Sequence, residues 1–430
     1  MIKKLLGLSV LKLGNHKNGR RVWIANSKLA QSFNIGDSLL LDYDSVKRRI
    51  TIDKAELLGN HSVSSRNKKD VIIDIKNQLV ETTLGINVGK VEVLFYKNRV
   101  VVRVSRKDIE ISNRENKTTG KMFEFFSSAG TLSHFMRKYG GYKPTGILEM
   151  ENDLVKMYEK NHGDDVFTIV SRLEDIHPDE FKKFRDIELI LAGIPCNSIS
   201  NSNIQNQKNM KKEREGKIFN SELMENRYQA EALTYYLLSA IKIMNPKKIV
   251  IEEVEAFSKT SASNMLRTVL KMEGYNISET VGKGSHNKRK RWCLIANHGP
   301  QIPLSKIDFV NDGLSINDLL ETSVKDREWF NKKEMKRISR AEKTVGIRSV
   351  KPDDIMSNTF TCHSTRSTEP VLQHPDDSDL YSEFTNQEIA NIHGLGDFIL
   401  SGIKTIDRRI LGQGVTDFFK PIAEMIKTIG

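Results

Sequence analysis

The chain of 430 residues is 38% hydrophobic and 28% charged, a balance typical of a soluble globular protein with two or three domains. Its apolar runs stay short of the roughly 18 residues that a membrane helix needs. The N-terminus lacks the small-residue cleavage site of a signal peptide. These features argue against a membrane protein, and we expect a cytoplasmic chain without a membrane partner.

Lys and Arg total 67 against 55 Asp and Glu, which leaves a formal charge of +12. A positive balance suits a polyanionic partner such as a nucleic acid. The three cysteines, Cys196, Cys293 and Cys362, lie at no metal-ligand spacing and are too few for a disulfide framework. We therefore expect no metal site, and each cysteine is by default a reduced, buried thiol.

Residues 1–112 contain two similar units that are rich in short alternating strands. The units are Arg21–Ile52 and Val71–Val104, and each predicts a strand, a short helix, a glycine turn, a strand, a turn and a strand. Gly36 in the first unit corresponds to Gly89 in the second. We expect both glycines to close the turn after the helix with a positive φ.

This repeat resembles the swapped-hairpin DNA-binding domains of AbrB-like transition-state regulators, which work as intertwined homodimers. The resemblance implies that the two units form one such domain inside a single chain and bind duplex DNA. A β-rich accessory domain that only packs on the rest of the chain is the alternative. The polar, basic connection His61–Asp70 suits a linker or a phosphate-contacting loop.

From about Lys121 onward, apolar strands alternate with amphipathic helices. Strands are expected at Met122–Phe126, Thr145–Met150, Asp165–Val170, Glu188–Gly193 and Lys247–Val254, with helices from about Leu132 and over Asn152–His162. Such alternation predicts an α/β fold with a parallel sheet covered on both faces. Ligands of such sheets bind at the carboxyl ends of the strands.

Small residues, Ser127–Gly130, follow the first of these strands, and they allow a backbone to approach a ligand closely. The helix N-terminus behind them favours a carboxylate or a phosphate. Glu149 ends the next strand 19 positions after Gly130, near the spacing at which an acid binds ribose hydroxyls. Either feature alone also occurs in α/β proteins that bind no nucleotide.

Cys196 follows the strand Glu188–Gly193 directly after Pro195, so it is expected at the ligand end of the sheet. The next segment, Ser200–Lys217, is rich in Asn, Gln and Lys, as in a basic loop that closes over a polyanion. A structural cysteine at a strand end is the alternative interpretation.

Seven segments in this order, from about Lys121 to the C-terminus, resemble the motifs of the DNA (cytosine-5)-methyltransferase family. They are Phe123–Ser133, Gly146–His162, Gly193–Ser200, Ile249–Phe257, Asn287–Ala296, Phe384–Leu395 and Leu411–Val415. The departures from the family pattern are Ser128 for Gly, Asn197 for Gln, Glu253 for Asn, Asn287 for Gln and Gln413 for Asn. The family's adenine-contacting Asp would fall near Arg172, where Asp175 is the available substitute.

The resemblance implies a Rossmann-like S-adenosylmethionine-dependent methyltransferase fold with a small target-recognition region, beside the β-rich N-terminal domain. The implied catalytic domain is 119–300, the target-recognition region is 301–381, and 382–430 returns to the catalytic domain. The implied cofactor is S-adenosylmethionine, with Glu149 on the ribose and Met150 against the adenine. The residues expected to bind it are Phe126, Ser128, Gly130, Thr131, Leu132, Glu149, Met150, Asp175 and Pro195.

The resemblance also implies the chemistry. Because C5 of cytosine is a weak nucleophile, the Cys196 thiolate first adds at C6 and makes C5 enamine-like. Glu252 then protonates or hydrogen-bonds N3, and Arg289 stabilises O2 and the thiolate. The target base must leave the duplex to meet the thiol. Ser200, Arg291, Thr361 and Arg366 are the expected substrate-binding residues.

The implied function is that of a DNA (cytosine-5-)-methyltransferase acting on double-stranded DNA. It belongs to a restriction-modification system with a cognate endonuclease, or it is a solitary enzyme. A relative acting on tRNA and a catalytically weak DNA-binding regulator are the alternatives. A binding protein needs none of Cys196, Glu252 and Arg289, so their joint presence favours an enzyme. Cys293 and Cys362 are interpreted as structural.

Overall fold

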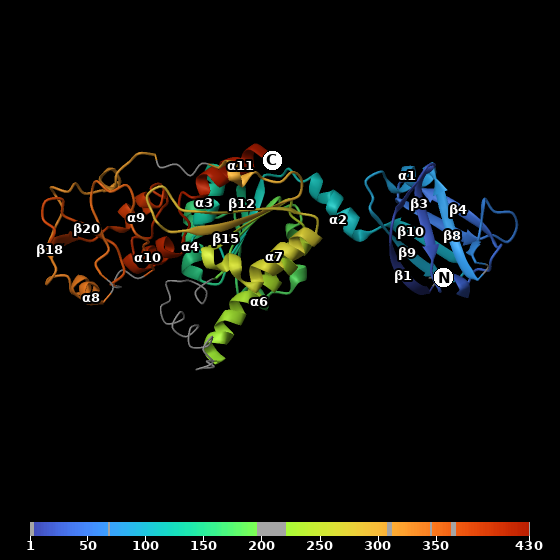
Figure 1. The fold of residues 1–430 in the computed structure, drawn as a ribbon, viewed down its shortest axis with the longest axis horizontal. Coiled ribbons are helices and arrows are strands. Elements are labelled where there is room, and N and C mark those ends of the chain that lie inside the picture. Colours follow the sequence, from blue (N-terminus) through green and yellow to red (C-terminus); the bar gives the residue numbers. More distant parts are fainter. Residues whose placement is uncertain are drawn as a thin grey trace. The chain divides into compact units, whose positions relative to one another are not determined.

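The computed structural model describes residues 4–67, 69–195, 221–307, 312–344, 346–362 and 367–429, without the side chains of 221–230 and 306. The chain divides into two compact units, Met1–Asn113 and Arg114–Gly430 (Figure 1). The boundary falls inside helix α2 (Arg106–Glu115). Across these described ranges, no helix combines the length and apolarity that crossing a membrane requires.

The first unit consists of two interlocked sheets. One has the order β1-β9-β10-β5-β4-β6 and the other the order β2-β3-β8-β7. The elements are β1 (Leu5–Lys12), β2 (Gly14–His16), β3 (Gly19–Ala25), η1 (Leu29–Gln31), β4 (Ser38–Asp44), β5 (Arg49–Lys54), β6 (His61–Ser62), β7 (Ser64–Arg66), β8 (Asp70–Asn77), α1 (Gln78–Leu84), β9 (Lys90–Tyr96) and β10 (Arg99–Val104).

The two sequence repeats pair with each other, strand to equivalent strand. Strand β3 of the first repeat is antiparallel to β8 of the second, with Ile24 opposite Ile73. Strand β5 is likewise antiparallel to β10, with Ile50 opposite Val102. The outer strands follow the same exchange, because β1 pairs with β9 and β6 pairs with β4. The repeats therefore share one apolar core rather than forming one each.

Two expectations for this unit are wrong in detail. Gly36 has a φ of 89°, as expected, but the positive-φ glycine after α1 is Gly85, at 104°, and not Gly89. The helix α1 spans a full seven residues and ends at Gly85, which closes it as a C-cap. The segment His61–Asp70 is not a linker, because β6 and β7 belong to the two sheets.

The second unit is built on a seven-stranded sheet with the order β13-β12-β11-β14-β15-β17-β16. Its strands are β11 (Lys121–Phe125), β12 (Lys143–Glu149), β13 (Phe167–Val170), β14 (Leu189–Gly193), β15 (Lys248–Val254), β16 (Asn276–Gly282) and β17 (Arg291–Asn297). The first five are parallel, whereas β17 runs antiparallel to both of its neighbours. The expected parallel sheet therefore has one reversed strand. Its order switches direction between β11 and β14, where ligands of such sheets bind.

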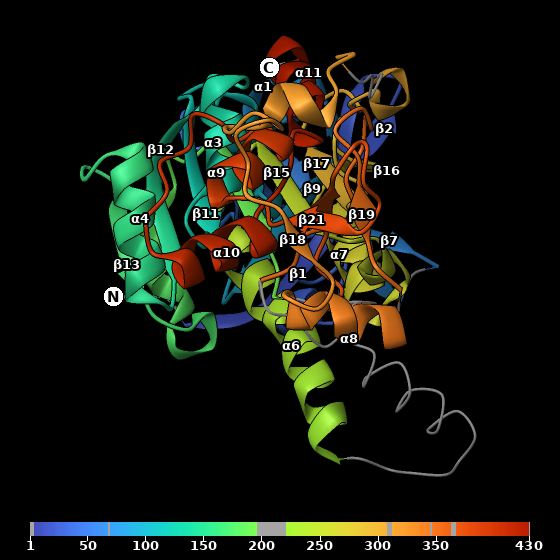
Figure 2. The ribbon, with the colours of Figure 1, turned by 90° about the vertical axis from the view of Figure 1, so that its left-hand side faces the viewer.

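Helices cover both faces of this sheet (Figure 2). The helices α3 (Thr131–Lys138), α4 (Asn152–His162) and α11 (Phe419–Ile429) contribute to the core on one face, and α6 (Ser221–Met244) and α7 (Ser261–Met272) to the core on the other. Strand β14 is buried from Leu189 to Ala192. Such a continuous apolar run is the pattern of a strand covered on both faces.

The chain after β17 forms a smaller region before it returns to the large sheet. Its elements are η5 (Leu304–Lys306), η6 (Ile316–Leu319), β18 (Phe330–Asn331), α8 (Lys336–Thr344), β19 (Ser349–Val350), β20 (Val371–Gln373), β21 (Leu380–Ser382), α9 (Asn386–Ile392) and α10 (Lys404–Gln413). Four of the strands form a sheet with the order β18-β21-β20-β19. Helix α9 begins with a capping box, in which Thr385 and Glu388 satisfy each other's backbone amides. These two motif residues therefore have a local structural role.

Candidate active site

A buried carboxylic acid lies at the carboxyl ends of β14 and β15. Glu252 of β15 is opposite Gly193 of β14, and a Cβ atom built on Gly193 would lie 3.8 Å from Glu252 Oε2. Strand β14 continues into the exposed Pro195. The predicted nucleophile Cys196 comes next in the chain and lies outside the described residues, as do Ser200 and Arg366. The acid is thus beside the strand that leads to Cys196.

Glu252 is paired with an arginine of the neighbouring strand. Arg291 Nε lies 2.6 Å from Glu252 Oε1, and the side chains are only 12% and 10% exposed. Burial raises the pKa of Glu252, and the positive charges of Arg291 and Arg289 offset this only in part. The carboxyl therefore holds a proton more firmly than a surface glutamate does, as a proton donor must.

Arg289 is held by the end of helix α10. It is buried, and its Nη1 donates a hydrogen bond to the carbonyl oxygen of Gly412 over 2.6 Å. Its backbone amide donates to Asn287 Oδ1 at 2.8 Å, and the Asn287 amide lies 3.0 Å from His393 Nε2. The ion pair with Glu252 is therefore made by Arg291, while Arg289 contributes charge from nearby.

The side chain of Glu253, the next residue of β15, does not point the same way as that of Glu252. Neighbouring strand residues point to opposite faces, so Glu253 turns away from the side of Glu252. Glu253 is buried, and its Oε2 accepts a hydrogen bond from the amide of Val254 at 2.7 Å. Glu253, which departs from the family pattern, therefore lies on the other face of β15 from Glu252.

The loop between β11 and α3 has an unusual backbone. Phe126, Ser128 and Gly130 have φ values of 56°, 49° and 85°, all in the left-handed region. Ser128 stands where the family has glycine, and it keeps the conformation that glycine adopts freely. A Cβ on Gly130 would lie 2.5 Å from the Tyr158 ring and 2.6 Å from His162 Nε2. Only glycine fits this close approach.

Glu149 ties this loop to the end of β12. Its Oε2 accepts a hydrogen bond from the Ser128 amide at 2.8 Å, and Oε1 accepts from the amides of Met150 and Glu151 at 2.8 and 3.0 Å. A carboxylate offers about four acceptor positions, so one remains for a ligand hydroxyl. Met150 is 58% exposed, and its side chain is available to an apolar ligand face.

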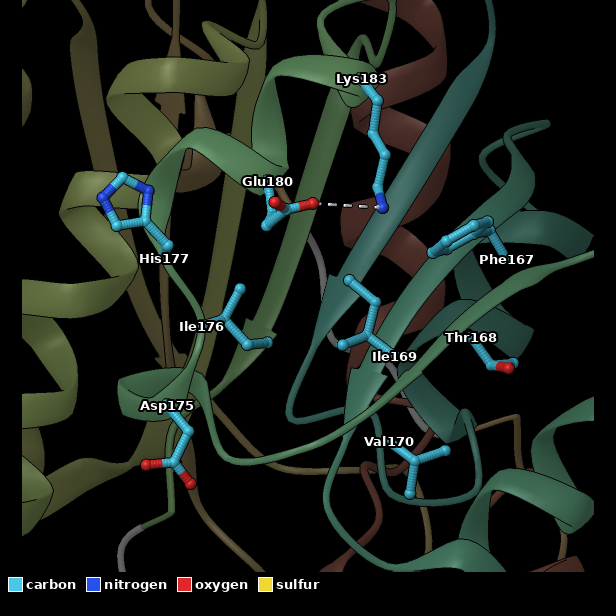
Figure 3. A pocket seen from close by; sticks show the side chains of 9 residues that line it. All are labelled: Phe167, Thr168, Ile169, Val170, Asp175, Ile176, His177, Glu180 and Lys183. Atoms are coloured by element: carbon cyan, nitrogen blue, oxygen red, sulfur yellow. Dashed lines mark ion pairs between the residues drawn. The ribbon is translucent and has the colours of Figure 1, made fainter.

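Asp175 lies at the outer edge of the sheet. It is the last residue of η2 (Leu173–Asp175) and lines a shallow pocket along the edge strand β13 (Figure 3). The other lining residues are Phe167, Thr168, Ile169, Val170, Ile176, His177, Glu180 and Lys183. Arg172 is exposed and lies 3.8 Å from Glu174. The structure thus places Asp175 beside β13, the edge strand that pairs with β12.

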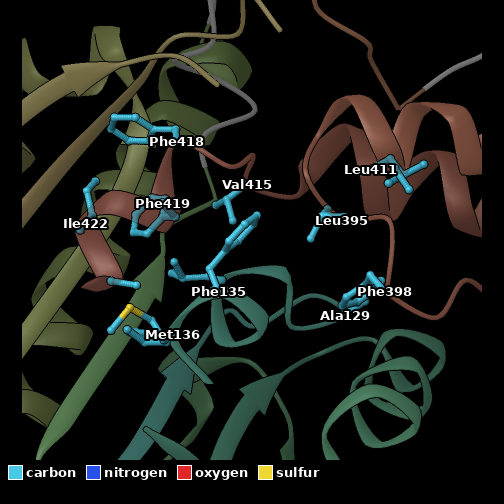
Figure 4. Close-up of a cluster of buried hydrophobic side chains, with 14 of the residues drawn as sticks. Ala129, Phe135, Met136, Leu395, Phe398, Leu411, Val415, Phe418, Phe419 and Ile422 are labelled. Carbon is cyan, nitrogen blue, oxygen red and sulfur yellow. The ribbon is translucent and has the colours of Figure 1, made fainter. Parts of the chain in front are cut away.

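The last motif of the chain returns to the first. The Val415 amide donates a hydrogen bond to Thr131 Oγ1 at 3.1 Å, and Ser128 Oγ lies 3.4 Å from Gln413 Oε1. Figure 4 shows the core beneath this contact, where Phe135 and other residues of α3 meet the C-terminal segment. Leu132 is part of that core. The amides of the first helical turn have no partner inside the helix.

Thr361 belongs to a segment that presses against Gly412. A Cβ on Gly412 would lie 2.6 Å from the Cα atom of Cys362, so no other residue fits there. The amide of Thr361 donates to Glu369 Oε1 at 2.7 Å. Since the Gly412 carbonyl also accepts a hydrogen bond from Arg289, this stretch of the predicted target-recognition region lies next to the predicted catalytic arginine.

Glu124 of β11 is a second buried acid, and it was not among the residues expected from the sequence. Burial raises its pKa to about 8, with further increases from Glu149 and Glu252, although a hydrogen bond from Ser133 opposes them. Tyr158 donates a hydrogen bond to Ser133 Oγ at 2.7 Å. The sequence does contain a signal for Glu124, because an acid inside the otherwise apolar strand Lys121–Phe125 is expected to be buried.

Comparison with known proteins gives the following likenesses. The sequence pattern of the C-5 cytosine-specific DNA methylase family matches residues 120–427. The S. pombe Dnmt2 methyltransferase structure is 19% identical with a TM-score of 0.54, covering 72% of this chain and 97% of that one. The Entamoeba histolytica methyltransferase EhMeth is 19% identical with a TM-score of 0.54, covering 71% and 97%. No curated protein sequence matches the chain. The predicted methyltransferase fold class is confirmed.

Proposed function

Because the chain belongs to the C-5 cytosine-specific DNA methylase family, we propose that it methylates C5 of a flipped cytosine in double-stranded DNA through a covalent adduct with Cys196. The family and the fold imply the use of S-adenosylmethionine. The observation that carries the proposal is the position of Glu252, a buried acid of raised pKa beside the strand that leads to Cys196.

The residues divide the reaction between them. The Cys196 thiolate adds to C6 of the cytosine, and Glu252 gives a proton to N3, so that electron density collects at C5. Bound S-adenosylmethionine supplies the electrophilic methyl group. A base then removes the C5 proton through water, the N3 proton returns to Glu252, and the Cys196 thiolate is eliminated. Arg289 and Arg291 offset the negative charge that develops at O2.

The cofactor loop fits S-adenosylmethionine by its donors and its shape. Glu149 keeps an acceptor position for a ribose hydroxyl, and Met150 offers an exposed thioether to the adenine face. The left-handed backbone at Phe126, Ser128 and Gly130 allows close approach. Amides of the first turn of α3 suit the carboxylate of the methionine moiety.

We also propose that the first unit binds duplex DNA, as its resemblance to AbrB-like domains implies. Two equivalent turns of the interlocked repeats carry exposed cations. Lys17 lies in the turn β2–β3, Arg66 ends β7, and Lys69 lies in the equivalent turn β7–β8. Residues 1–113, which have their own core, should bind duplex DNA with an affinity that falls steeply with salt. Salt-insensitive binding would leave this unit as a packing domain.

Methyl transfer to defined nucleic acids tests the enzymatic proposal. The purified chain receives labelled methyl donor with duplex DNA or with tRNA, beside a Cys196→Ser variant. Label should appear on DNA and vanish in the variant. Label on tRNA alone would favour the tRNA alternative, and label on neither would favour a DNA-binding regulator. Label that survives in Cys196→Ser would remove Cys196 as the nucleophile.

A further inference from the structure

Helix α8 (Lys336–Thr344) of the smaller region has one buried face and one basic face. Ile338 is buried with Val371 and Tyr381, and Ala341 is buried as well. The helix is therefore anchored on the small sheet, and its position is fixed by packing.

The opposite face of α8 carries Lys336, Arg340 and Lys343, all exposed. These three residues, the basic stripe, follow the spacing i, i+4, i+7, which places them on one side of the helix over about 10 Å. Like charges at this spacing destabilise a helix by a few tenths of a kcal/mol per pair. The stripe is therefore not explained by the stability of the helix itself.

Acids near the helix are bound to other cations. Lys332 in the preceding turn lies 3.1 Å from both Glu342 and Asp379. Arg337, between the two faces, lies 2.9 Å from Glu383. Within the described parts of the chain, no carboxylate lies within ion-pair distance of a stripe residue, so the three positive charges remain for an external partner.

The stripe lies in the region that the family uses for target recognition. Figures 1 and 2 both show α8 on the side of the second unit toward which the N-terminal end of α6 projects. The lysines Lys143, Lys420 and Lys427 lie at the opposite, amino end of the parallel strands. Lys143 begins β12, Lys420 lies over the Tyr139 ring at the end of α3, and Lys427 approaches Gly141.

We propose that the basic stripe binds phosphates along one strand of duplex DNA beside the target site. This inference rests on the proposed function, because it assumes DNA as the substrate. Cations on one helix face release counterions from the DNA backbone and fix its position without reading its sequence. The stripe then contributes affinity and register, while residues such as Thr361 remain for the bases.

The test is a charge-neutralised variant of the full chain, Lys336→Gln with Arg340→Gln and Lys343→Gln. The matched control is Lys143→Gln with Lys420→Gln and Lys427→Gln, which removes the same charge from the amino end of the strands. Binding to duplex oligonucleotides is measured between about 50 and 200 mM salt. The slope of log affinity against log salt should fall by about two to three units in the stripe variant, equally for different sequences, and stay unchanged in the control.

Methyl transfer by the same proteins separates this inference from the function. The stripe variant should raise KM for DNA at least tenfold and leave kcat unchanged. If the unaltered chain methylates DNA but the stripe variant keeps its salt slope and KM, the stripe is a solvated surface and the inference is wrong. If the unaltered chain does not methylate DNA, the proposed function fails first, and an unchanged slope would overturn the stripe too. Equal losses in the control variant would show a general charge effect and also overturn it.

Discussion

Two glutamates at the same edge of the large sheet are held in opposite ways. Glu149 is fixed by three backbone amides, and its carboxylate ties the loop between β11 and α3 to β12. Glu252 is held by an arginine side chain, and burial raises its pKa. The β11–β12 half of the edge therefore uses its acid to fix the backbone of the β11–α3 loop, whereas the β14–β15 half holds an acid whose pKa is raised.

The largest effect should come from Glu252, the proposed proton donor. Glu252→Gln keeps the shape but cannot protonate N3, so kcat should fall by about 10²- to 10⁴-fold. S-adenosylmethionine affinity should stay the same, because the β11–β12 half is untouched. In the unaltered chain, kcat should decline as pH rises through the raised pKa of Glu252, since the protonated form is active. Single-turnover rates and titration with S-adenosylmethionine check this. If Glu252→Gln also lost cofactor binding, the two halves of the edge would not act separately.

Gly130→Ala should distort the loop at the β11–β12 half of the edge. The new methyl group would overlap Tyr158 and His162, and a φ of 85° is unfavourable for alanine. Overpacking and the left-handed backbone together cost about 2–4 kcal/mol. We expect cofactor affinity to fall by about 30-fold or more, as calorimetry would measure. Gly120→Ala, with an open surrounding and a φ of 65°, is the matched control for backbone strain alone. Similar affinities in both variants would mean that close packing is unimportant.

Glu149→Gln tests the β11–β12 half of the edge without adding bulk. One oxygen becomes an amide group that cannot accept the hydrogen bond of a backbone amide, which costs about 1–3 kcal/mol. The dissociation constant and KM for S-adenosylmethionine should rise about tenfold, while kcat at saturation changes little. A drop in kcat at saturating cofactor would instead place Glu149 in the chemistry.

The last effect concerns stability rather than activity, and it depends on Glu124. Its pKa is raised to about 8, so the folded chain binds a proton there that the unfolded chain releases near pH 4.5. Stability should be fullest below that pH and fall as pH rises toward 8, by up to about 1.4 kcal/mol per pH unit. Thermal unfolding of Glu124→Gln should lack this part of the decline. An identical pH dependence in both proteins would show that Glu124 is not the group responsible.

The sequence predicted the strands of the large sheet and the acid at a strand end, because apolar runs and the residues that follow them are local features. The strand Glu188–Gly193 and the acid Glu149 could be located from apolar runs and spacing alone. The partner of Glu252 could not, because the choice between Arg289 and Arg291 depends on the pairing of β15 with β17. The burial of Glu124 likewise depends on α3 and α4, which cover it from distant parts of the chain.

The N-terminal repeats show the same limit on a smaller scale. The similar sequences predicted a positive φ at Gly89, the counterpart of Gly36. In the structure, the glycine with a positive φ is Gly85, because it is the residue at which helix α1 ends. The pairing of strands between the two repeats is a long-range feature. No local sequence pattern predicts it, and only the resemblance to AbrB-like domains suggested it.

The central claim is that Cys196 attacks cytosine with help from Glu252, and adduct trapping tests it most directly. Duplex DNA with fluorine at C5 of the target cytosine cannot lose a C5 proton, so a covalent intermediate should accumulate after methyl transfer. The account predicts a protein–DNA adduct that resists denaturation, is absent in Cys196→Ser, and forms much more slowly in Glu252→Gln. An adduct that persists in Cys196→Ser, or no adduct with any duplex that the chain methylates, would contradict it.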